Sequence, residues 1–339
     1  MKKFTSILAA LLTVSLLLVG CGQKNASSSG EEASAEDWKG GMITLLVPSA
    51  AGGGLDGMAR LLAPYLQEEL PSGSTVVVEN MTGGSGWVAW EYMFGKDADG
   101  TIIACAYTPQ IFSYLNPQLQ ISRTLDDFGL LCNMVFDSAT ICVAAEDTRF
   151  ADVNSLQDFV DYLKAHENET YTVAVTSAEG GDHLAMLDFC KQAGVTNLKE
   201  TYYSSVSDSA AAFMGRHVDV YFGKVGDTLS MYKEGSAKVL AVCKEERSDF
   251  MPDVPTAAEQ GYDVVNGSAR GWCVKPETPE YIQTAIVNAM TAAFNNEEFQ
   301  AAMQASGYDT TWYAGQDYVD FMAAQKEIVK SFSDLLGYN

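Results

Sequence analysis

Residues 43–60 read Ile43-Thr44-Leu45-Leu46-Val47-Pro48-Ser49-Ala50-Ala51-Gly52-Gly53-Gly54-Leu55-Asp56-Gly57-Met58-Ala59-Arg60. An apolar run comes first, a loop with four glycines follows, and from Met58 onward apolar residues recur at helical spacing. This order predicts a strand, a glycine loop and a helix. Glycine lets backbone N–H groups approach a ligand closely, and a helix N-terminus favours negative charge. The loop is therefore suited to hold an anion.

The same pattern recurs along the chain. A strand at residues 76–80 precedes the glycine loop 83–86, and another strand at 101–107 follows the next helix. Such alternation predicts parallel sheets with right-handed crossovers, whose ligands bind at the carboxyl ends of the strands. We therefore expect an α/β protein with two lobes around a ligand cleft. Residues 41–138 and 265–339 would form lobe 1, and residues 139–264 would form lobe 2.

Residues 1–20 predict a lipoprotein signal peptide that is not part of the fold. Lys2 and Lys3 precede a short apolar core, and Leu18-Val19-Gly20-Cys21 resembles a bacterial lipobox. We expect cleavage before Cys21, a lipid on its sulfur, and attachment to the extracytoplasmic face of the cell membrane. An ordinary signal peptide with an incidental cysteine is the alternative. Residues 21–40, rich in Ser, Ala and Glu, predict a flexible tether.

The composition excludes some classes of partner. The formal net charge of −23 repels nucleic acid, and there is no basic patch interleaved with aromatic residues. Any anion site must therefore act through local donors. The three histidines, His166, His183 and His217, have no partner at metal-ligand spacing, so we expect neither a metal nor a cofactor.

Six cysteines remain besides Cys21, and none forms a CxxC pair. Most lie in apolar runs, which favours buried free thiols, although an oxidising exterior would permit disulfides. Cys132 and Cys142 form the one pair worth testing.

Two patterns point to other kinds of protein. Residues 52–57 satisfy the dinucleotide-binding fingerprint, and Glu79 ends the next strand where a ribose-binding acid would lie. However, residues 48–51 separate the strand from the glycines, where the fingerprint needs a tight turn. Asp182-His183 is either an acid–base pair or a helix cap beside a packed histidine. We expect no catalytic activity; an extracytoplasmic enzyme and a receptor for a signalling partner are the alternatives.

As a set, the motifs resemble the substrate-binding proteins of tripartite tricarboxylate transporters, the Bug family. The first pattern is Val-Pro-x-x-x-Gly-Gly-x-x-Asp-x-x-Ala-Arg-Leu-Leu-Ala, which begins at Val47. In order along the chain follow Val77-Val78-Glu79-Asn80 with its glycine loop, Asp99-Gly100, Asp182-His183-Leu184-Ala185, Pro252-Asp253-Val254-Pro255-Thr256-Ala257-Ala258-Glu259, Arg270-Gly271 and Thr278-Pro279. The resemblance covers residues 41–330.

The resemblance implies a two-lobed periplasmic-binding-protein fold of type II character. It further implies capture of a small di- or tricarboxylate and its delivery to the membrane subunits of a secondary transporter. We expect the protein to act as a monomer. Leu55 replaces the family's usual Ser or Thr, and Tyr107-Thr108-Pro109 is bulkier than usual, which predicts a smaller pocket.

The resemblance also implies which residues line the ligand site, mainly through backbone amides and bridging waters. They are Ser49, Ala50, Gly52, Gly53, Gly54, Asp56, Gly83, Gly84, Ser85, Thr108, Thr176, Ser177, Gly181, Asp182, His183, Ser204 and Ser205. Lys224 stands where the family often has an Asp-Asn-like pair; it either pairs with a distal carboxylate or is a solvated lysine at the rim. Arg270 is either a bidentate carboxylate partner or a structural arginine that bridges the lobes.

Overall fold

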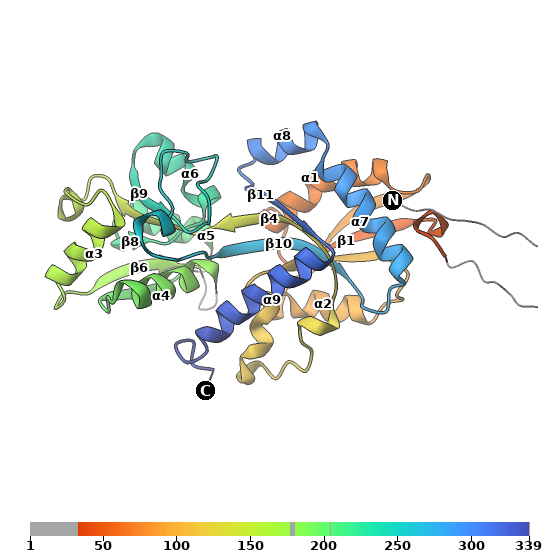
Figure 1. Ribbon diagram of the computed structural model, residues 1–339, viewed down its shortest axis with the longest axis horizontal. Helices are drawn as coiled ribbons and strands as arrows, with labels where there is room; N and C mark the ends of the chain where they lie inside the picture. The colour runs from red at the N-terminus through yellow and green to blue at the C-terminus, as the bar shows by residue number, and fades with distance from the viewer. Residues whose placement is uncertain (1–32, 177–179, 204, 339) are drawn as a thin grey trace, which may run out of the picture. The chain divides into compact units, whose positions relative to one another are not determined.

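The computed structural model describes residues 33–176, 180–203 and 205–338 (Figure 1). The predicted signal peptide, Cys21 and most of the predicted tether lie outside the described residues. From Ser34 onward the chain forms one compact unit that contains two β-sheets. Among the described helices, none has the length and apolar character needed to cross a membrane.

The first sheet has six strands in the order β11-β4-β10-β3-β1-β2. They are β1 (Met42–Val47), β2 (Thr75–Asn80), β3 (Ile102–Tyr107), β4 (Gly129–Ser138), β10 (Gly267–Val274) and β11 (Thr310–Ala314). β1 runs parallel to β2 and β3, whereas β10 is antiparallel to β3 and β4. The helices that pack on this sheet are α1 (Gly54–Glu69), α2 (Trp87–Phe94), α7 (Glu280–Phe294), α8 (Glu297–Ala305) and α9 (Gln316–Ser331).

The second sheet has five strands in the order β7-β6-β8-β5-β9. They are β5 (Thr140–Ala144), β6 (Tyr171–Val175), β7 (Leu198–Tyr202), β8 (Val220–Tyr221) and β9 (Ala237–Val242). β6 runs parallel to β7 and β8, and β5 is antiparallel to β8 and β9. The helices that accompany this sheet are α3 (Leu156–Ala165), α4 (Gly181–Ala193), α5 (Val206–Met214) and α6 (Val225–Glu234). We call the six-stranded sheet with its helices the first half of the protein, and the five-stranded sheet with its helices the second half.

The backbone passes between the two sheets at the ends of β4 and β10, which lie side by side in Figure 1. Ala139 alone separates β4 from β5, and its N–H donates to the Asn266 carbonyl at 2.9 Å. The Cys243 N–H donates to the Ala139 carbonyl at 2.7 Å. These bonds fix the passage at the start of β10, so the strand ends of both sheets meet near residues 138–140 and 266–267.

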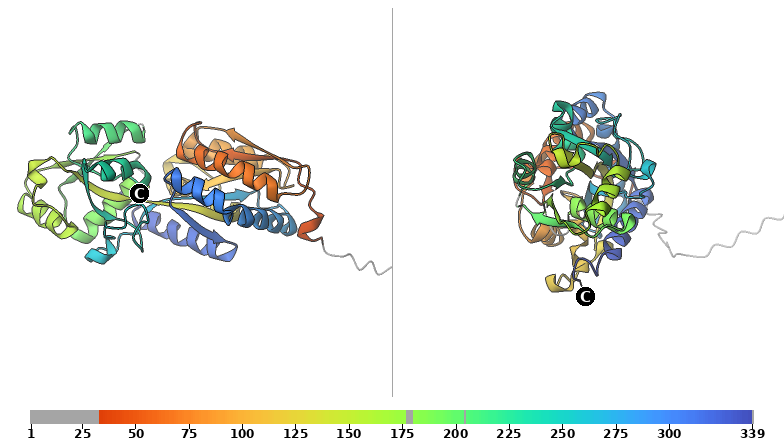
Figure 2. Two further views of the ribbon diagram at one scale, coloured as in Figure 1. Left: turned by 90° about the horizontal axis from the view of Figure 1, so that it is seen from above. Right: turned by 90° about the vertical axis from the view of Figure 1, so that its left-hand side faces the viewer.

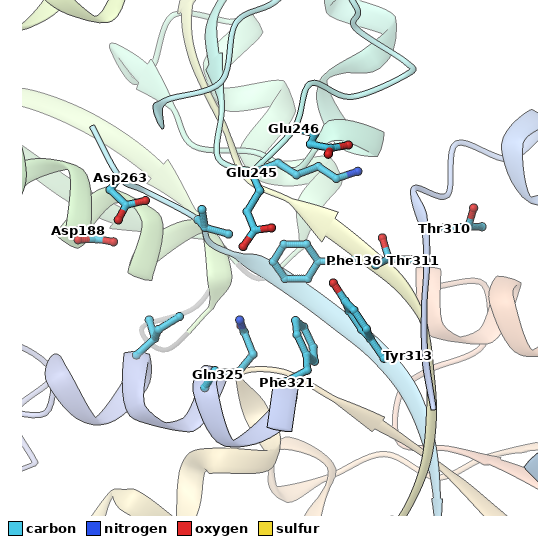
Figure 3. Close-up of a pocket in the computed structure, with 14 residues that line it drawn as sticks. Phe136, Asp188, Glu245, Glu246, Asp263, Thr310, Thr311, Tyr313, Phe321 and Gln325 are labelled. Atoms are coloured by element: carbon cyan, nitrogen blue, oxygen red, sulfur yellow. The ribbon is translucent and has the colours of Figure 1, made fainter. Parts of the chain in front are cut away.

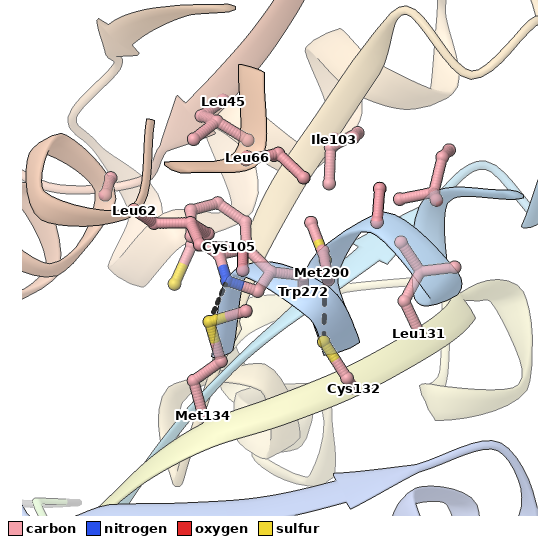
Figure 4. Close-up of a cluster of buried hydrophobic side chains, with 14 of the residues drawn as sticks. Leu45, Leu62, Leu66, Ile103, Cys105, Leu131, Cys132, Met134, Trp272 and Met290 are labelled. Atoms are coloured by element: carbon pink, nitrogen blue, oxygen red, sulfur yellow. Dashed lines mark hydrogen bonds between the residues drawn. The ribbon is translucent and has the colours of Figure 1, made fainter. Parts of the chain in front are cut away.

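Each half has its own hydrophobic core. Figure 2 shows α1 beside α7, and apolar side chains of both helices lie in one core with Trp272 of β10. The Trp272 Nε1 donates to the Met134 Sδ at 3.3 Å, and the Cys132 Sγ lies 3.5 Å from the Met290 Sδ (Figure 4). Burial of each large apolar side chain contributes about 1.5–3 kcal/mol.

The cysteines of the described residues are free thiols. Cys132 lies in the core of the first half and Cys142 in a core of the second. Burial raises the pKa of the Cys142 thiol to about 12. Thiols of this kind are unreactive packing residues.

Candidate functional site

Loops from the carboxyl ends of strands in both sheets meet around a pocket of about 210 Å³. Ser49 follows β1, Thr108 follows β3, Thr176 follows β6 and Lys224 follows β8. The lining residues are Ser49, Gly53, Gly54, Leu55, Tyr107, Thr108, Pro109, Gln110, Thr176, Gly180, Gly181, Lys224, Ser268 and Arg270. Predicted site residues from distant parts of the chain are thus brought together at one place.

Asp56 fixes the conformation of the first glycine loop by accepting a hydrogen bond from its backbone. Its Oδ2 accepts hydrogen bonds from the Gly52 N–H at 2.8 Å and from the Arg60 Nε at 2.9 Å. The carboxylate is 3% exposed, and the bond from Arg60 lowers its pKa to about 2. Asn80 reaches the same loop, because its Nδ2 donates to the Ser49 carbonyl at 3.1 Å. Asp56 is therefore a positioning residue that does not line the pocket.

Arg270 lies against the start of α1. A Cβ on Gly54 would lie 2.9 Å from the Arg270 Nη1, so the glycine lets the guanidinium pack closely against the start of α1. The Tyr308 hydroxyl donates to the Gly54 carbonyl at 2.9 Å, and the Arg270 Cζ lies 5.7 Å from the centre of the Tyr308 ring. The Arg270 Nη2 also forms an ion pair with the Asp137 Oδ2 at 2.7 Å. Arg270 thus lines the pocket and bridges elements at the same time.

Thr108 joins the end of β3 to β10. Its N–H donates to the Ala269 carbonyl at 3.0 Å, and its Oγ1 accepts from the Ala269 N–H at 2.9 Å. The Ser268 hydroxyl donates to the Thr108 carbonyl at 2.8 Å. Thr108 therefore forms a fixed part of the pocket wall.

The Asp182 carboxylate accepts hydrogen bonds from the loop after β6, just as the Asp56 carboxylate accepts one from the loop after β1. Its Oδ2 accepts from the Thr176 N–H at 2.7 Å and from the Thr176 Oγ1 at 2.8 Å, and the carboxylate is 1% exposed. His183 is buried and packs edge-on against Tyr202, with ring centres 5.6 Å apart. Asp182 lies inside α4, whose N-cap is Gly180, so it is not the predicted helix cap and is instead hydrogen-bonded to the loop residue Thr176.

The other predicted site residues that the structure describes are not among the lining residues. Gly83, Gly84 and Ser85 precede α2, and the Tyr107 hydroxyl donates to the Ser85 carbonyl at 3.1 Å. The Ser205 Oγ caps α5 by accepting from the Asp208 N–H at 3.1 Å. Ala50, Gly52, Asp56, Asp182 and His183 also stand outside the lining set. Ser177 and Ser204 lie outside the described residues.

Lys224, which follows β8 and immediately precedes α6 in the chain, lines the pocket. Burial lowers the pKa of its ammonium, but the negative charges of Asp182 and Asp227 outweigh this effect and the pKa is raised overall. The ammonium therefore stays charged. Within the described residues, no carboxylate oxygen lies within 4 Å of its Nζ, the limit for an ion pair.

Six of the lining residues that the structure describes are absent from the predicted set, namely Leu55, Tyr107, Pro109, Gln110, Gly180 and Ser268. Ser268 had a usable signal, because it lies two residues before Arg270 on one strand and alternate strand residues share a face. Gln110 begins a short 3₁₀ helix after β3 and carries no pattern that marks it.

Comparison with known proteins identifies the family. The profile of the tripartite tricarboxylate transporter family receptor matches residues 58–335. Protein BugT of Bordetella pertussis is 27% identical over 231 residues, or 68% of this chain and 68% of BugT. A UPF0065 protein of Agrobacterium vitis, from the TAR-I ttuE-ttuC' intergenic region, is 26% identical over 261 residues, or 75% of this chain and 71% of that protein.

Solved structures share the fold at lower identity. A TctC solute-binding protein from Polaromonas, without ligand, has a TM-score of 0.75 at 24% identity and covers 86% of this chain and 98% of its own. MatC from Rhodopseudomonas palustris, with bound malate, has a TM-score of 0.68 at 20% identity over 87% and 98%. Another protein of that organism, with adipate, has a TM-score of 0.71 at 21% identity over 89% and 99%.

These likenesses confirm the predicted two-lobed α/β fold of periplasmic solute-binding proteins. Because the profile match extends over most of the 339 residues, the chain belongs to the family of tripartite tricarboxylate transporter receptors.

Proposed function

We propose that this protein captures a small organic acid with two or three carboxylates and delivers it to the membrane subunits of a tripartite tricarboxylate-type secondary transporter. It does so as a monomer without catalytic activity, held at the extracytoplasmic face of the membrane by a lipid on Cys21. Membership of the receptor family supports the role in transport. The malate and adipate in two structures of the same fold support the class of ligand.

The Lys224 ammonium is the main support for this proposal. It lines the pocket, remains charged and has no carboxylate partner within 4 Å among the described residues. A ligand carboxylate would supply that partner. Charge-assisted hydrogen bonds of this type contribute about 1.5–3 kcal/mol each.

Besides the lysine, two helix N-termini give the pocket a positive electrostatic potential. α1 begins at Gly54 and α4 at Gly181, and both starting residues line the pocket. The N-cap residues, Gly53 and Gly180, have no side chain that could accept from the first N–H groups of these helices. The first N–H groups of a helix lack intrahelical acceptors, and the helix dipole favours an anion there. One helix from each half thus presents donors to a ligand held between them.

The size of the pocket favours a small acid over a dinucleotide. Its volume of about 210 Å³ is below the roughly 300–1,000 Å³ typical of sites for drug-sized ligands. Glu79, which would bind a ribose in the dinucleotide interpretation, is exposed at the end of β2 and is not among the lining residues.

A thermal-unfolding screen of the full chain in detergent tests the proposal. The ligands are malate, adipate and citrate, the neutral diamides of the two diacids, and NAD. A ligand at 100 times its dissociation constant stabilises the fold by about 2.7 kcal/mol, so an acid that binds should raise the melting temperature while its diamide does not. A shift with NAD alone would contradict the proposal, as would turnover of a stabilising acid.

A further inference from the structure

A second cavity, of about 730 Å³, backs onto the strand that carries Asp137 (Figure 3). Phe136 of β4 lines this cavity, whereas the adjacent Asp137 binds Arg270 in the pocket described above. Because successive strand residues point to opposite faces, the two openings lie on opposite faces of β4. The second cavity is lined by side chains from both halves of the chain, including α4 and α9.

The cavity is strongly acidic. Asp188, Glu245, Glu246 and Asp263 line it, and Figure 3 shows them on two sides of the opening. Lys244 also lines it, but its Nζ lies 2.8 Å from both carboxylate oxygens of Asp309. The lysine charge is thereby matched, and the four carboxylates give the lining a net negative charge.

Part of the lining is aromatic. Phe321 of α9 stacks on Tyr313 of β11 with ring centres 4.7 Å apart, and it meets Phe136 edge-on at 5.8 Å. Aromatic rings pack against hydrocarbon chains and also attract cations. Carboxylates and aromatic rings in one concave site therefore favour an organic ammonium ion.

Gln325 gives an independent sign of a ligand. It is 9% exposed on α9, and Figure 3 shows its amide pointing into the cavity. The described part of the chain offers this amide no hydrogen-bond partner. The amide atoms of Gln325 are accessible from the cavity, where water or a ligand can satisfy them. The amide is thus free to bind a group that enters the cavity.

A bare metal ion fits poorly. Among the described residues, no group of three or more His, Cys, Asp or Glu side chains is arranged to hold one. The acidic groups are spread over the cavity, so they suit a cation whose charges are also spread. We propose that this cavity binds a small organic diammonium ion, with carboxylates at its charged ends and the aromatic wall along its carbon chain.

Calorimetric titration of the full chain in detergent with 1,5-diaminopentane tests this proposal. The neutral isostere 1,5-pentanediol is the ligand control. The titration is run at about 0.15 M salt, where the Debye length of about 8 Å limits non-specific attraction to the acidic surface. The variants are Asp188→Asn combined with Glu245→Gln, and separately Gln325→Ala. Glu68→Gln, at an exposed position on α1, removes the same kind of charge elsewhere.

Saturable binding of the diamine at one site is expected, with no binding of the diol. The double variant should weaken binding at least tenfold and Gln325→Ala at least threefold, while Glu68→Gln leaves it unchanged. Equal binding of the diol, or the same affinity in the double variant and in Glu68→Gln, would overturn the proposal. Binding of a lysine-rich peptide but not of the diamine would also overturn it, because the cavity would then serve a protein partner.

Discussion

Arg270 and Asp137 form a buried ion pair at the pocket. The Arg270 Nη2 lies 2.7 Å from the Asp137 Oδ2, and the two side chains are 11% and 7% exposed. Asp137 belongs to β4 and Arg270 to the neighbouring antiparallel strand β10, so the pair ties together the strands at which the two halves meet. This carboxylate already matches the guanidinium charge, which is why we propose Lys224 and not Arg270 as the main partner of a ligand anion.

Breaking this pair from one side should be costly. We expect Arg270→Met or Asp137→Leu alone to lower the free energy of unfolding by about 3–5 kcal/mol, because each leaves an uncompensated buried charge. The free energy of unfolding that the double variant loses should be clearly smaller than the sum of the losses in the two single variants. Urea denaturation of the wild type and the three variants measures the coupling. Additive losses would show that the two side chains act independently.

Gly181 is required where α4 meets β10. A Cβ at this position would collide with the Gly267 carbonyl, and backbone atoms cannot move aside cheaply. Gly181→Ala should therefore destabilise the protein by about 2 kcal/mol or more, as overpacking does. Gly95→Ala is the matched control, because Gly95 has a φ of −78° and the nearest atom to its added Cβ is 3.5 Å away. Equal melting temperatures for the two variants would refute this role of Gly181.

Asp56 should contribute stability that depends on pH. Its pKa falls from an ordinary 3.8 to about 2 in the folded state, chiefly through the bond from Arg60. A lowered pKa stabilises the fold above the unfolded-state value, and this contribution is lost as the pH falls through about 2. The stability difference between the wild type and Asp56→Asn should therefore be largest above pH 4 and shrink between pH 4 and pH 2. A difference that stays constant over this window would count against the ion pair.

Local patterns were enough to predict the fold class, and some of the predicted site residues line the pocket. The glycines of residues 52–57 need a strand before them and a helix after them, and β1 and α1 are found there. Ser49 and Thr108 follow neighbouring parallel strands of one sheet, whose carboxyl ends meet at one edge, whereas Thr176 follows a strand of the other sheet. The family resemblance implied a place at the ligand site for all three, and all three line the pocket.

What escaped prediction depends on contacts between distant parts of the chain. Asp137 lies 133 residues from Arg270, and its register with β10 decides that it matches the arginine charge. Asp56 and Asp182 belong to the same motifs as loops that line the pocket. Their carboxylates, however, accept hydrogen bonds from those loops and do not line the pocket themselves. The acidic cavity takes side chains from segments spread over nearly 200 residues, and no local pattern connects Phe136 with Gln325.

The central claim is that Lys224 binds a carboxylate of the ligand, and calorimetric titration of one substitution tests it most directly. Lys224→Ala is compared with the wild type and with Lys233→Ala, which removes an exposed lysine from the same helix region. The titrant is the diacid that stabilises the wild type most.

Loss of a charge-assisted bond of about 1.5–3 kcal/mol should weaken binding by about tenfold or more in Lys224→Ala, while Lys233→Ala binds as the wild type does. Equal affinity in all three proteins would contradict the claim and leave the backbone donors of α1 and α4 to hold the ligand without this lysine.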